Sequence, residues 1–319
     1  MDGMIAEPQC WQQCRRCPVN KTVLKWAGSK ARLSAKLREC LPEGDRLVEP
    51  FGGSCAVMMN TDYPEYLIAD VNPDLINLYK VIAAEPESFI NHARYYFEHG
   101  NGEVEYYGIR HAFNFCAPEP AYRASMFLYL NRHCFNGLCR YNRAGDFNVP
   151  YGRYKKPYFP EEEIRAFAEK AKRATFICAD FHETLRLVRS GDVVYCDPPY
   201  LPEKGKDAFT NYHSGEFGKR EHLSLAVNAR RIGQSGIPVV ISNSIRAAEI
   251  NLYHGFDVAE IDAPRSISAS GDSAKTAREV LASITPTEAL LPGHSIRVSY
   301  PAWCGIDLAA EAVPEVTSE

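Results

Sequence analysis

Short apolar runs, separated by stretches with helical spacing, recur in two blocks of this sequence, at about residues 23–72 and 174–284. Such runs predict strands, and strands that alternate with helices predict a mostly parallel sheet with helices on both faces. We therefore expect an α/β fold. The predicted strands are Arg46–Glu49, Tyr66–Asp70, Thr175–Ala179, Val193–Cys196, Pro238–Asn243, Phe256–Ala259 and Glu279–Ile284.

The residues between the blocks have a different pattern. Apolar side chains first recur at helical spacing, and the later stretch Cys139–Val149, with turn residues at Asn142–Gly145, predicts a β-hairpin. We expect residues 73–159 to form an inserted, mainly helical domain. The helical positions are Leu75, Leu78, Tyr79 and Ile82.

The remaining chain is divided accordingly. Residues 22–72 and 160–310 are expected to form the main domain. Residues 1–21 are predicted to be a disordered N-terminal extension, and residues 311–319 a C-terminal tail.

The tetrapeptide Asp197-Pro198-Pro199-Tyr200 follows the run that ends at Cys196. Its prolines lock φ and remove backbone donors, so a carboxylate, a rigid carbonyl and a ring are presented in one turn. Asp197 and the carbonyl of Pro198 are suitable acceptors for an exocyclic amine, and Tyr200 is suited to stack on a base. These groups fit adenine, whose amine must be drawn out of the ring plane before it attacks an electrophilic methyl group. The alternative for this motif alone is an ordinary proline turn.

A glycine pair, Gly52-Gly53, follows the first predicted strand in the segment Glu49–Ser54. A ligand can approach such a backbone closely. The next strand ends at Asp70, where nucleotide-binding α/β folds place the carboxylate that holds ribose hydroxyls. The segment lacks the Gly-x-Gly-x-x-Gly spacing of a dinucleotide site. The pattern predicts a nucleoside site.

The segment Leu24–Lys30 precedes the glycine pair and supplies an aromatic face, Trp26, and a cation, Lys30. The spacing of a phosphate-binding P-loop is missing, which argues against a triphosphate site. A tryptophan face beside a sulfonium is favoured by cation–π attraction. The alternatives are a core aromatic for Trp26 and a solvated helix start for Lys30.

Basic residues are concentrated between residues 122 and 160, although the whole chain has a formal net charge of −4. The segment has seven Lys and Arg against one acid, Asp146, so it carries +6 and leaves −10 for the rest. Ten aromatic residues lie among them, a composition typical of a phosphate-clamping and base-stacking surface. The alternative is a solvated basic face over an aromatic core. The basic residues are Arg123, Arg132, Arg140, Arg143, Arg153, Lys155 and Lys156.

Composition limits the class of protein. A chain of 319 residues, 45% of them hydrophobic, can bury a sizeable core. No apolar stretch approaches the eighteen or so residues of a membrane span, and the N-terminus lacks a signal-peptide pattern, so a cytoplasmic protein is expected. Eleven scattered cysteines indicate free thiols in a reducing compartment.

Five motifs occur in a fixed order: Lys-Trp-Ala-Gly-x-Lys, Glu-Pro-Phe-x-Gly, Asp-x-Asn, Asn-Gly-Leu-x-Arg and Asp-Pro-Pro-Tyr. Over about residues 23–284 the chain resembles the Dam family of DNA adenine-N6 methyltransferases. The stretches 130–142 and 147–160 are similar to its enterobacterial branch. A cofactor loop before the insert and Asp-Pro-Pro-Tyr after it match the alpha group of amino-methyltransferases.

The resemblance implies a Rossmann-like methyltransferase sheet, S-adenosylmethionine as methyl donor, and direct transfer to N6 of a flipped adenine in duplex DNA. The implied catalytic residues are Asp197, Pro198 and Tyr200. The implied cofactor-binding residues are Trp26, Lys30, Glu49, Phe51, Gly52, Gly53, Asp70, Asp180, Phe181 and Asp197. Cys196 is expected to be a small buried residue, not a nucleophile.

The resemblance also makes residues 73–159 a DNA-recognition domain for the palindrome GATC. Lys25 and Arg140 would read guanine, Leu138 and Pro150 would touch thymine methyl groups, and Phe135 with Asn136 would probe the space left by the flipped base. Close relatives often have Tyr at the position of Phe135, so the hydroxyl is missing here. Arg132 belongs to the same basic surface. We expect a monomer that acts on duplex DNA without an obligate protein partner, encoded by a bacterium or a phage.

The N-terminal extension contains Cys10, Cys14 and Cys17, which lie outside the resemblance. Their spacing occurs at iron–sulfur sites, and a zinc clip with an outside ligand is another possibility. Because the segment is polar and no barrel pattern follows it, we expect a disordered tail without metal.

Two other functions are compatible with parts of the sequence. One is methylation of the N4 amine of cytosine, for which the first motif residue is usually Ser, so Asp197 favours adenine. The other is a DNA-binding regulator that keeps the fold without the chemistry. The presence of Asp197, Tyr200 and Trp26 argues against it.

Overall fold

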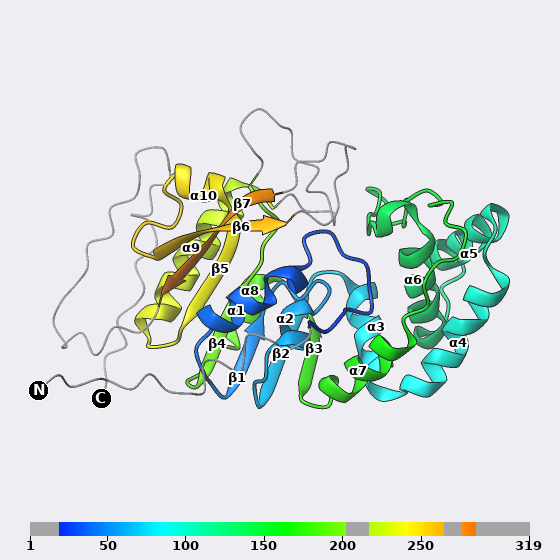
Figure 1. Ribbon diagram of the computed structural model, residues 1–319, viewed down its shortest axis with the longest axis horizontal. Coiled ribbons are helices and arrows are strands. Elements are labelled where there is room, and N and C mark those ends of the chain that lie inside the picture. Colours follow the sequence, from blue (N-terminus) through cyan, green and yellow to red (C-terminus); the bar gives the residue numbers. More distant parts are fainter. Residues whose placement is uncertain (1–18, 202–216, 265–275, 285–319) are drawn as a thin grey trace, which may run out of the picture. The chain divides into compact units, whose positions relative to one another are not determined.

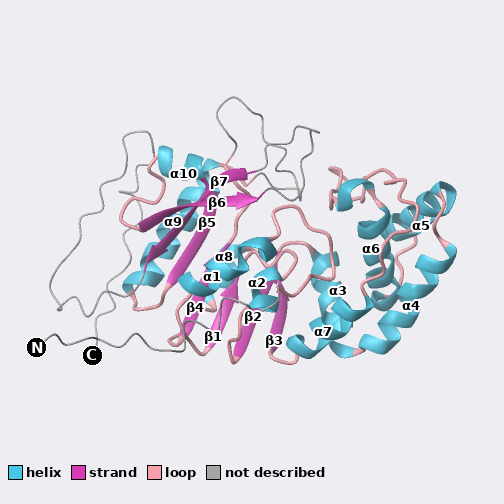
Figure 2. Ribbon diagram, viewed as in Figure 1, coloured by secondary structure: helices cyan, strands magenta, loops and turns pink. Residues whose placement is uncertain are grey.

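The computed structural model describes residues 19–201, 217–264 and 276–284. Within this part of the chain seven strands form one sheet in the order β3-β2-β1-β4-β5-β7-β6 (Figure 1 and Figure 2). The strands are β1 (Arg46–Glu49), β2 (Glu65–Asp70), β3 (Ala174–Cys178), β4 (Asp192–Cys196), β5 (Val239–Ser244), β6 (Asp257–Pro264) and β7 (Thr276–Ile284).

Strand pairing confirms a mostly parallel sheet. β1 pairs in parallel with β2 and β4, β2 with β3, and β4 with β5. β7 lies between β5 and β6 and is antiparallel to both. The strand predicted at Phe256–Ala259 is longer than expected: β6 continues to Pro264 because β7 pairs with it over its whole length.

Helices cover both faces of the sheet, and the alternation of side chains along the strands explains why. In β4, Val193 and Tyr195 belong to one hydrophobic core, while Val194 and Cys196 belong to the other. The first core includes residues of α1 (Ser34–Cys40), α2 (Ala56–Asn60), α3 (Pro73–Ala84) and α7 (Glu161–Ala171). The second core includes residues of α8 (Phe181–Arg186), α9 (Lys219–Gln234) and α10 (Ile245–Glu249).

Five α-helices, α3 to α7, lie between β2 and β3 in the chain, and four of them, α3 to α6, fall within residues 73–159 (Figure 1). Besides α3 they are α4 (Pro86–His99), α5 (Glu103–Phe115) and α6 (Pro120–His133). α6 contacts α3, α4 and α5, and every residue from Phe127 to His133 is buried. Because these helices share the first core with the sheet, they are anchored directly to the domain that carries the strands. The boundaries 73–159 stay a prediction.

The segment expected to be a hairpin forms a turn without regular strands. Residues Tyr141 and Phe147 make one isolated antiparallel bridge, and the Asn142 side chain accepts hydrogen bonds from the backbone of Ala144 and Asp146. Two backbone hydrogen bonds flank this pair, from the Asn142 N–H to the Asp146 carbonyl and from the Asn148 N–H to the Arg140 carbonyl, while the Asn114 side chain binds the outward-facing N–H and C=O of Phe147.

Several predicted segments lie outside the described residues. They include Cys10, Cys14 and Cys17 and the tail at 311–319. Of the helices that the structure describes, none combines the length and the hydrophobicity required to cross a membrane.

Candidate active site

Two loops leave the sheet where its strand order reverses, between β1 and β4. The chain continues from β1 to β2 on one side and from β4 to β5 on the other. Loops that diverge in this way leave a crevice at the carboxyl ends of the strands, the usual ligand site of such sheets. The loop after β1 contains Gly52 and Gly53, and the loop after β4 contains Asp197–Tyr200. The fold therefore brings together two motifs that are far apart in sequence.

Both oxygens of the Asp197 carboxylate have partners. Oδ1 accepts a hydrogen bond of 2.7 Å from the hydroxyl of Ser242, which itself accepts one of 3.0 Å from Tyr195. Oδ2 lies 2.8 Å from Nζ of Lys30, in an ion pair where the exposed fractions are 6% for Lys30 and 22% for Asp197. The carboxylate is thus fixed in direction while one side stays open to solvent.

The Lys30 ammonium group has two further partners beside Asp197. It donates to the carbonyl of Gly28 at 2.8 Å, and it lies 4.7 Å from the centre of the Tyr200 ring. The Tyr200 hydroxyl donates to Oε2 of Glu279 at 2.8 Å, which fixes the ring plane. A group rich in N–H donors is therefore favoured between the Asp197 carboxylate and this ring.

The glycine loop is packed too closely for side chains. A Cβ atom at Gly52 would lie 2.5 Å from Cγ2 of Ile68, and one at Gly53 would lie 2.9 Å from Nε1 of Trp26. Gly53 also has a φ of +45°, a region that disfavours other residues. A hydrogen bond of 3.0 Å between the hydroxyls of Ser54 and Ser29 joins this loop to the turn that carries Trp26 and Lys30.

Asp70, at the end of β2, points back to the glycine loop. Its Oδ2 accepts a hydrogen bond of 3.0 Å from the N–H of Gly53, and its Oδ1 accepts one of 2.9 Å from the N–H of Asn72. The acid is therefore placed where the sequence predicted it, next to the loop that follows β1.

Glu49 is the last residue of β1 and is 2% exposed. Burial, together with the nearby negative charge of Asp197 and against a hydrogen bond to the Met58 backbone, raises the pKa of this carboxyl to about 8. Within the described residues its Oε1 has no hydrogen-bond partner. A buried, unpartnered polar atom beside the glycine loop is a suitable contact for a polar ligand.

Aromatic rings border the other side of this crevice. Phe51 stacks on Phe181 with ring centres 5.8 Å apart, and Phe217 packs edge-on against both rings. Asp180 precedes Phe181, is exposed, and caps α8 through a hydrogen bond of 2.8 Å from the N–H of Glu183. The structure therefore brings Phe181 to the glycine loop as predicted.

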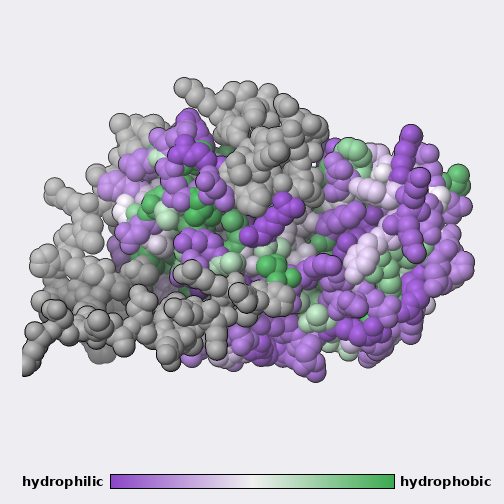
Figure 3. Space-filling model, in the orientation of Figure 1, coloured by the Kyte–Doolittle hydropathy of each residue, from purple (hydrophilic) through white to green (hydrophobic). Residues whose placement is uncertain are grey.

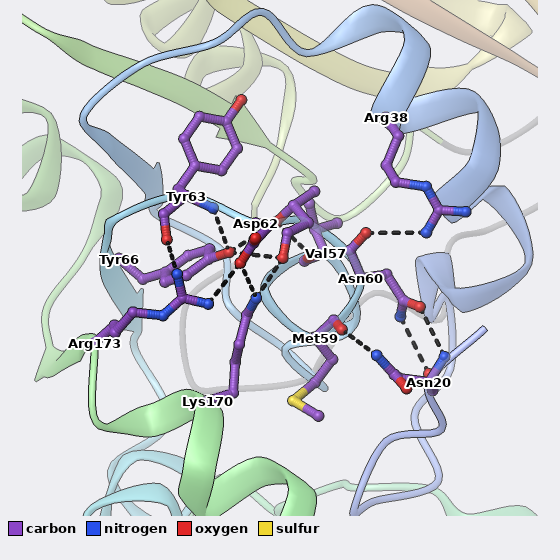
Figure 4. Close-up of polar contacts among 11 residues, drawn as sticks. Asn20, Arg38, Val57, Met59, Asn60, Asp62, Tyr63, Tyr66, Lys170 and Arg173 are labelled. Atoms are coloured by element: carbon purple, nitrogen blue, oxygen red, sulfur yellow. Dashed lines mark hydrogen bonds and ion pairs between the residues drawn. The ribbon is translucent and has the colours of Figure 1, made fainter. Parts of the chain in front are cut away.

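The short helix α2 follows the glycine loop, and hydrogen bonds at its C-terminal end hold it in place (Figure 4). Its last carbonyls, at Met59 and Asn60, accept hydrogen bonds from Asn20 at 2.8 Å and from Arg38 at 3.0 Å. The carbonyl of Thr61 accepts from the Lys170 ammonium group. Cationic donors at a helix C-terminus satisfy its free carbonyls and oppose the helix dipole. These hydrogen bonds fix α2, whose first turn follows the glycine loop.

The residues predicted to contact DNA fall into two groups, a first group around Phe135 and a second group of basic side chains. Lys25 and Gly137 are joined by the Asn131 side chain, which accepts from the Lys25 N–H at 2.9 Å and donates to the carbonyls of both residues. Burial lowers the pKa of Lys25, and its ammonium group lies 4.2 Å from the centre of the Tyr154 ring. Next to this junction, Phe135 is 46% exposed.

Neighbouring residues complete the first group. Asn136 has a φ of +56°, and its N–H donates to the Tyr154 hydroxyl at 3.0 Å. Pro150 is exposed and its carbonyl accepts from the N–H of Phe135 at 2.9 Å, while Leu138 is half-buried. The Arg140 guanidinium group is held by Asn148, with Nε 2.8 Å from Oδ1.

Two basic residues of the segment are structural. Arg132 is 7% exposed, its guanidinium group donates to the carbonyls of Thr22 and Val23, and burial lowers its pKa to about 10. Arg123 forms an ion pair with Asp74. Four others are exposed and form no ion pair with a carboxylate that the structure describes; they are Arg143, Arg153, Lys155 and Lys156. The face of the molecule in Figure 3 is mainly hydrophilic over the helices α4 to α7.

Sequence reasoning missed Ser242 and Glu279, which bind Asp197 and Tyr200, and Phe217, which packs against Phe51 and Phe181. One signal was present for Ser242, because it lies near the carboxyl end of the buried strand β5, next to β4. Polar residues at that end of a parallel strand face the ligand crevice. No comparable signal marked Glu279 or Phe217.

Comparisons with known proteins agree with this geometry. A family model described as D12 class N6 adenine-specific DNA methyltransferase matches residues 26–267. The retron Ec67 DNA adenine methylase of Escherichia coli is 54% identical over 262 residues, which are 82% of this chain and 90% of that protein. The DNA adenine methylase of Serratia marcescens is 47% identical over 251 residues, 78% of this chain and 93% of that protein. The DNA N-6-adenine-methyltransferase of Escherichia phage P1 is 44% identical over 266 residues, 82% of this chain and 35% of that protein.

The matched region contains both loops of the crevice, from the turn at Trp26 to the tetrapeptide at Asp197–Tyr200. It confirms the resemblance found in the sequence and decides in favour of adenine over the N4 amine of cytosine. With its Asp197 carboxylate held at the carboxyl edge of the sheet, this chain belongs to the D12 class of N6 adenine-specific DNA methyltransferases, and it is an enzyme that methylates adenine in DNA.

Proposed function

We propose that the enzyme transfers a methyl group from S-adenosylmethionine to N6 of the adenine in duplex GATC, after flipping that base out of the helix. The observation that carries the proposal is the position of the Asp197 carboxylate, fixed by Ser242 and Lys30 beside the Tyr200 ring, at the edge between β1 and β4. This turn lies next to a loop whose geometry suits a nucleoside.

The residues around the glycine loop fit S-adenosylmethionine. Gly52 and Gly53 let Ile68 and Trp26 pack directly against the loop backbone, Asp70 is placed for ribose hydroxyls, and Glu49 has a buried oxygen without a partner among the described residues. Phe51 and Phe181 supply ring faces for a flat base. Asp180 and Phe181 line the same edge.

Trp26 and Lys30 complete this cofactor site. The Trp26 indole faces the glycine loop, where its electron-rich ring would favour a sulfonium. Bound there, S-adenosylmethionine supplies an electrophilic methyl group. Lys30 forms an ion pair with Asp197, and Asp197 in turn accepts a hydrogen bond from the adenine amine. Asp197 therefore contacts both the cofactor site and the target base.

The catalytic turn orients the adenine amine. Asp197 and the Pro198 carbonyl accept its two N–H bonds, so the nitrogen lone pair is turned out of the ring plane and toward the methyl group. Tyr200 holds the base by stacking. For the amine to enter, the Lys30 ammonium group gives up part of its contact with Asp197, because both groups bind the same carboxylate.

Transfer is direct, without a covalent intermediate on the enzyme. The thiol nearest the turn, Cys196, is fully buried, and burial raises its pKa, so it is neither accessible nor ionised at neutral pH. The proton released from N6 after transfer leaves through the Asp197 side of the site, which is the part exposed to solvent.

Recognition of GATC is assigned to the exposed group near Phe135. Lys25 and Arg140 read guanine, Leu138 and Pro150 contact thymine methyl groups, and Phe135 with Asn136 fills the gap left by the flipped base. Arg132 is left out of this surface because its guanidinium group is buried against Thr22 and Val23. A single chain carries all of these groups, so we assign the activity to a monomer.

The test is expression in a bacterial strain without DNA methylation, followed by a genome-wide map of modified bases. N6-methyladenine confined to GATC is the expected result, and the Asp197→Ala variant is expected to lose at least about a hundredfold in rate. Methylation at another sequence would refute the recognition residues and leave the chemistry intact. A wild-type rate for Asp197→Ala would refute the catalytic assignment.

A further inference from the structure

The start of helix α3 is tied to the turn that carries Arg140. Oδ2 of Asp74, in the first turn of α3, accepts a hydrogen bond of 2.7 Å from the Tyr141 hydroxyl. The side-chain amide of Asn72, the N-cap of the same helix, lies 3.6 Å from Sγ of Cys139. The residues immediately before and after Arg140 are therefore both attached to one helix end.

These attachments decide which way Arg140 points. In a locally extended chain, alternate side chains point to opposite sides. Because Cys139 and Tyr141 contact the start of α3, the side chain between them is turned to the other side, where it is held by Asn148 and remains partly exposed. The direction of Arg140 thus depends on contacts made by its neighbours.

Asp74 is a rigid anchor for this turn. It is 4% exposed, its N–H is capped by Asn72, and its Oδ1 lies 2.5 Å from Nε of Arg123 on α6. Arg123 in turn stacks over the Phe113 ring of α5 at 4.1 Å. The carboxylate also lies at a helix N-terminus, which favours its negative charge. The anchor is therefore shared by three helices.

The same helix end is continuous with the active site. Asn72 donates its backbone N–H to Asp70, and Asp70 accepts the N–H of Gly53 in the glycine loop. The turn that carries Arg140 is thus positioned relative to the strand end that borders the crevice, through Asp74 and Asn72.

We propose that Asp74 and Tyr141 are positioning residues for sequence discrimination: they set the direction of Arg140 without contacting the DNA. This inference rests on the proposed role of Arg140 as a reader of guanine. Losing the Tyr141 hydroxyl removes a hydrogen bond to a charged acceptor, and the turn can then shift. Misplacement of Arg140 weakens its contact with the correct base pair more than its general attraction to DNA.

The variant Tyr141→Phe is the sharpest test, since it keeps the ring that packs edge-on against Phe147. Removing Asp74 would instead leave the half-buried Arg123 without this ion pair and would disturb the start of α3 as well as the turn. Tyr158→Phe is the matched control, because the Tyr158 hydroxyl also donates to a carboxylate, that of Glu163 at 2.9 Å, away from the turn.

The measurement is the ratio of kcat/KM on a duplex with the preferred site to that on duplexes with one guanine pair replaced. Tyr141→Phe is expected to lower this ratio about tenfold, with KM for S-adenosylmethionine unchanged, whereas Tyr158→Phe keeps the wild-type ratio. In an Arg140→Ala background, Tyr141→Phe is expected to change the ratio less than about twofold, because the residue it positions is gone.

The outcomes separate this inference from the proposed function. A wild-type ratio for Tyr141→Phe, or an equal further loss in the Arg140→Ala background, would overturn the positioning role. If wild-type enzyme prefers a sequence other than GATC, the proposed specificity fails, and the same ratio is measured on the preferred sequence, so that the role of Tyr141 is still decided.

Discussion

The ammonium group of Lys30 lies 2.8 Å from Oδ2 of Asp197, and only 6% of the Lys30 side chain is exposed. Lys30 begins the 3-10 helix η3 (Lys30–Leu33), which precedes α1 and β1, whereas Asp197 follows β4. A buried ion pair that joins these two segments links the cofactor side of the crevice to the catalytic turn. Four predictions follow from this arrangement and from its surroundings.

Replacing Lys30 with methionine is expected to lower kcat/KM for methylation at least about tenfold. The variant keeps the apolar stem and removes the charge that holds Asp197, so the carboxylate loses one of its two fixed contacts. Lys36→Met is the control, because Lys36 is exposed and pairs only with Glu39 on the same helix. Equal rates for the two variants in a steady-state methylation assay would contradict a role for the ion pair.

Substituting alanine for Gly53 is expected to weaken binding of S-adenosylmethionine about tenfold and to lower the free energy of unfolding by about 1–3 kcal/mol. The new Cβ would lie 2.9 Å from the Trp26 ring nitrogen, at a φ of +45°. Gly108→Ala is the control: no atom lies within 4 Å of the added carbon in α5, so a gain of about 0.4–1 kcal/mol is expected. Calorimetric titration and chemical unfolding measure both effects, and identical behaviour of the two variants would disprove the close packing of the loop.

Glu49 makes folding stability depend on pH. Its folded pKa of about 8 lies above the ordinary value of 4.5, so the folded state binds more protons between these pH values. The stability that this group contributes is present below about pH 4.5 and is lost as pH rises toward 8. The free energy of unfolding of the wild-type protein is expected to fall by on the order of 3 kcal/mol between pH 5 and pH 8 because of this group. Glu49→Gln is expected to abolish that decrease. Urea unfolding of both proteins at the two pH values checks this, and parallel pH profiles would contradict it.

Lys155 and Lys156 are expected to bind phosphates without reading sequence. Both are exposed and lack a carboxylate partner among the described residues. Replacing both by alanine should weaken DNA binding equally for all sequences and reduce the slope of log K against log salt by about 2. The matched control removes Lys36 and Lys172, which pair with Glu39 and Glu169. An equal change of slope in the control would show a general effect of charge.

Much of the fold could be predicted from local pattern. The strand boundaries of β1 agree with the prediction, those of β2 and β4 differ by one residue at one end, and those of β3 and β5 differ by one residue at both ends. The hairpin was the exception, because an isolated bridge between Tyr141 and Phe147 forms where two strands were expected. The outward-facing backbone groups of Phe147 bind the side chain of Asn114 in α5, a contact between residues distant in sequence that leaves no mark in the local pattern.

The candidate site was predicted less evenly. Asp197, Gly53 and Asp70 lie at strand ends, where residue type and position together indicate a function. Arg132 was assigned to a basic DNA surface from its charge alone, but the structure buries its guanidinium group against Thr22 and Val23. Charge is readable from sequence, while the direction of a side chain depends on what packs around it.

The sequence by itself determined the succession of strands along the chain, the family to which its motifs belong and the close packing at Gly52 and Gly53, because these depend on residue type and short-range spacing. Only the tertiary structure decided that Lys30 pairs with Asp197, that Ser242 orients the same carboxylate, and that Asp74 holds Tyr141. The reason is physical: such contacts join residues from separate elements, and they form only once the sheet order and the packing of the helices have brought those elements together.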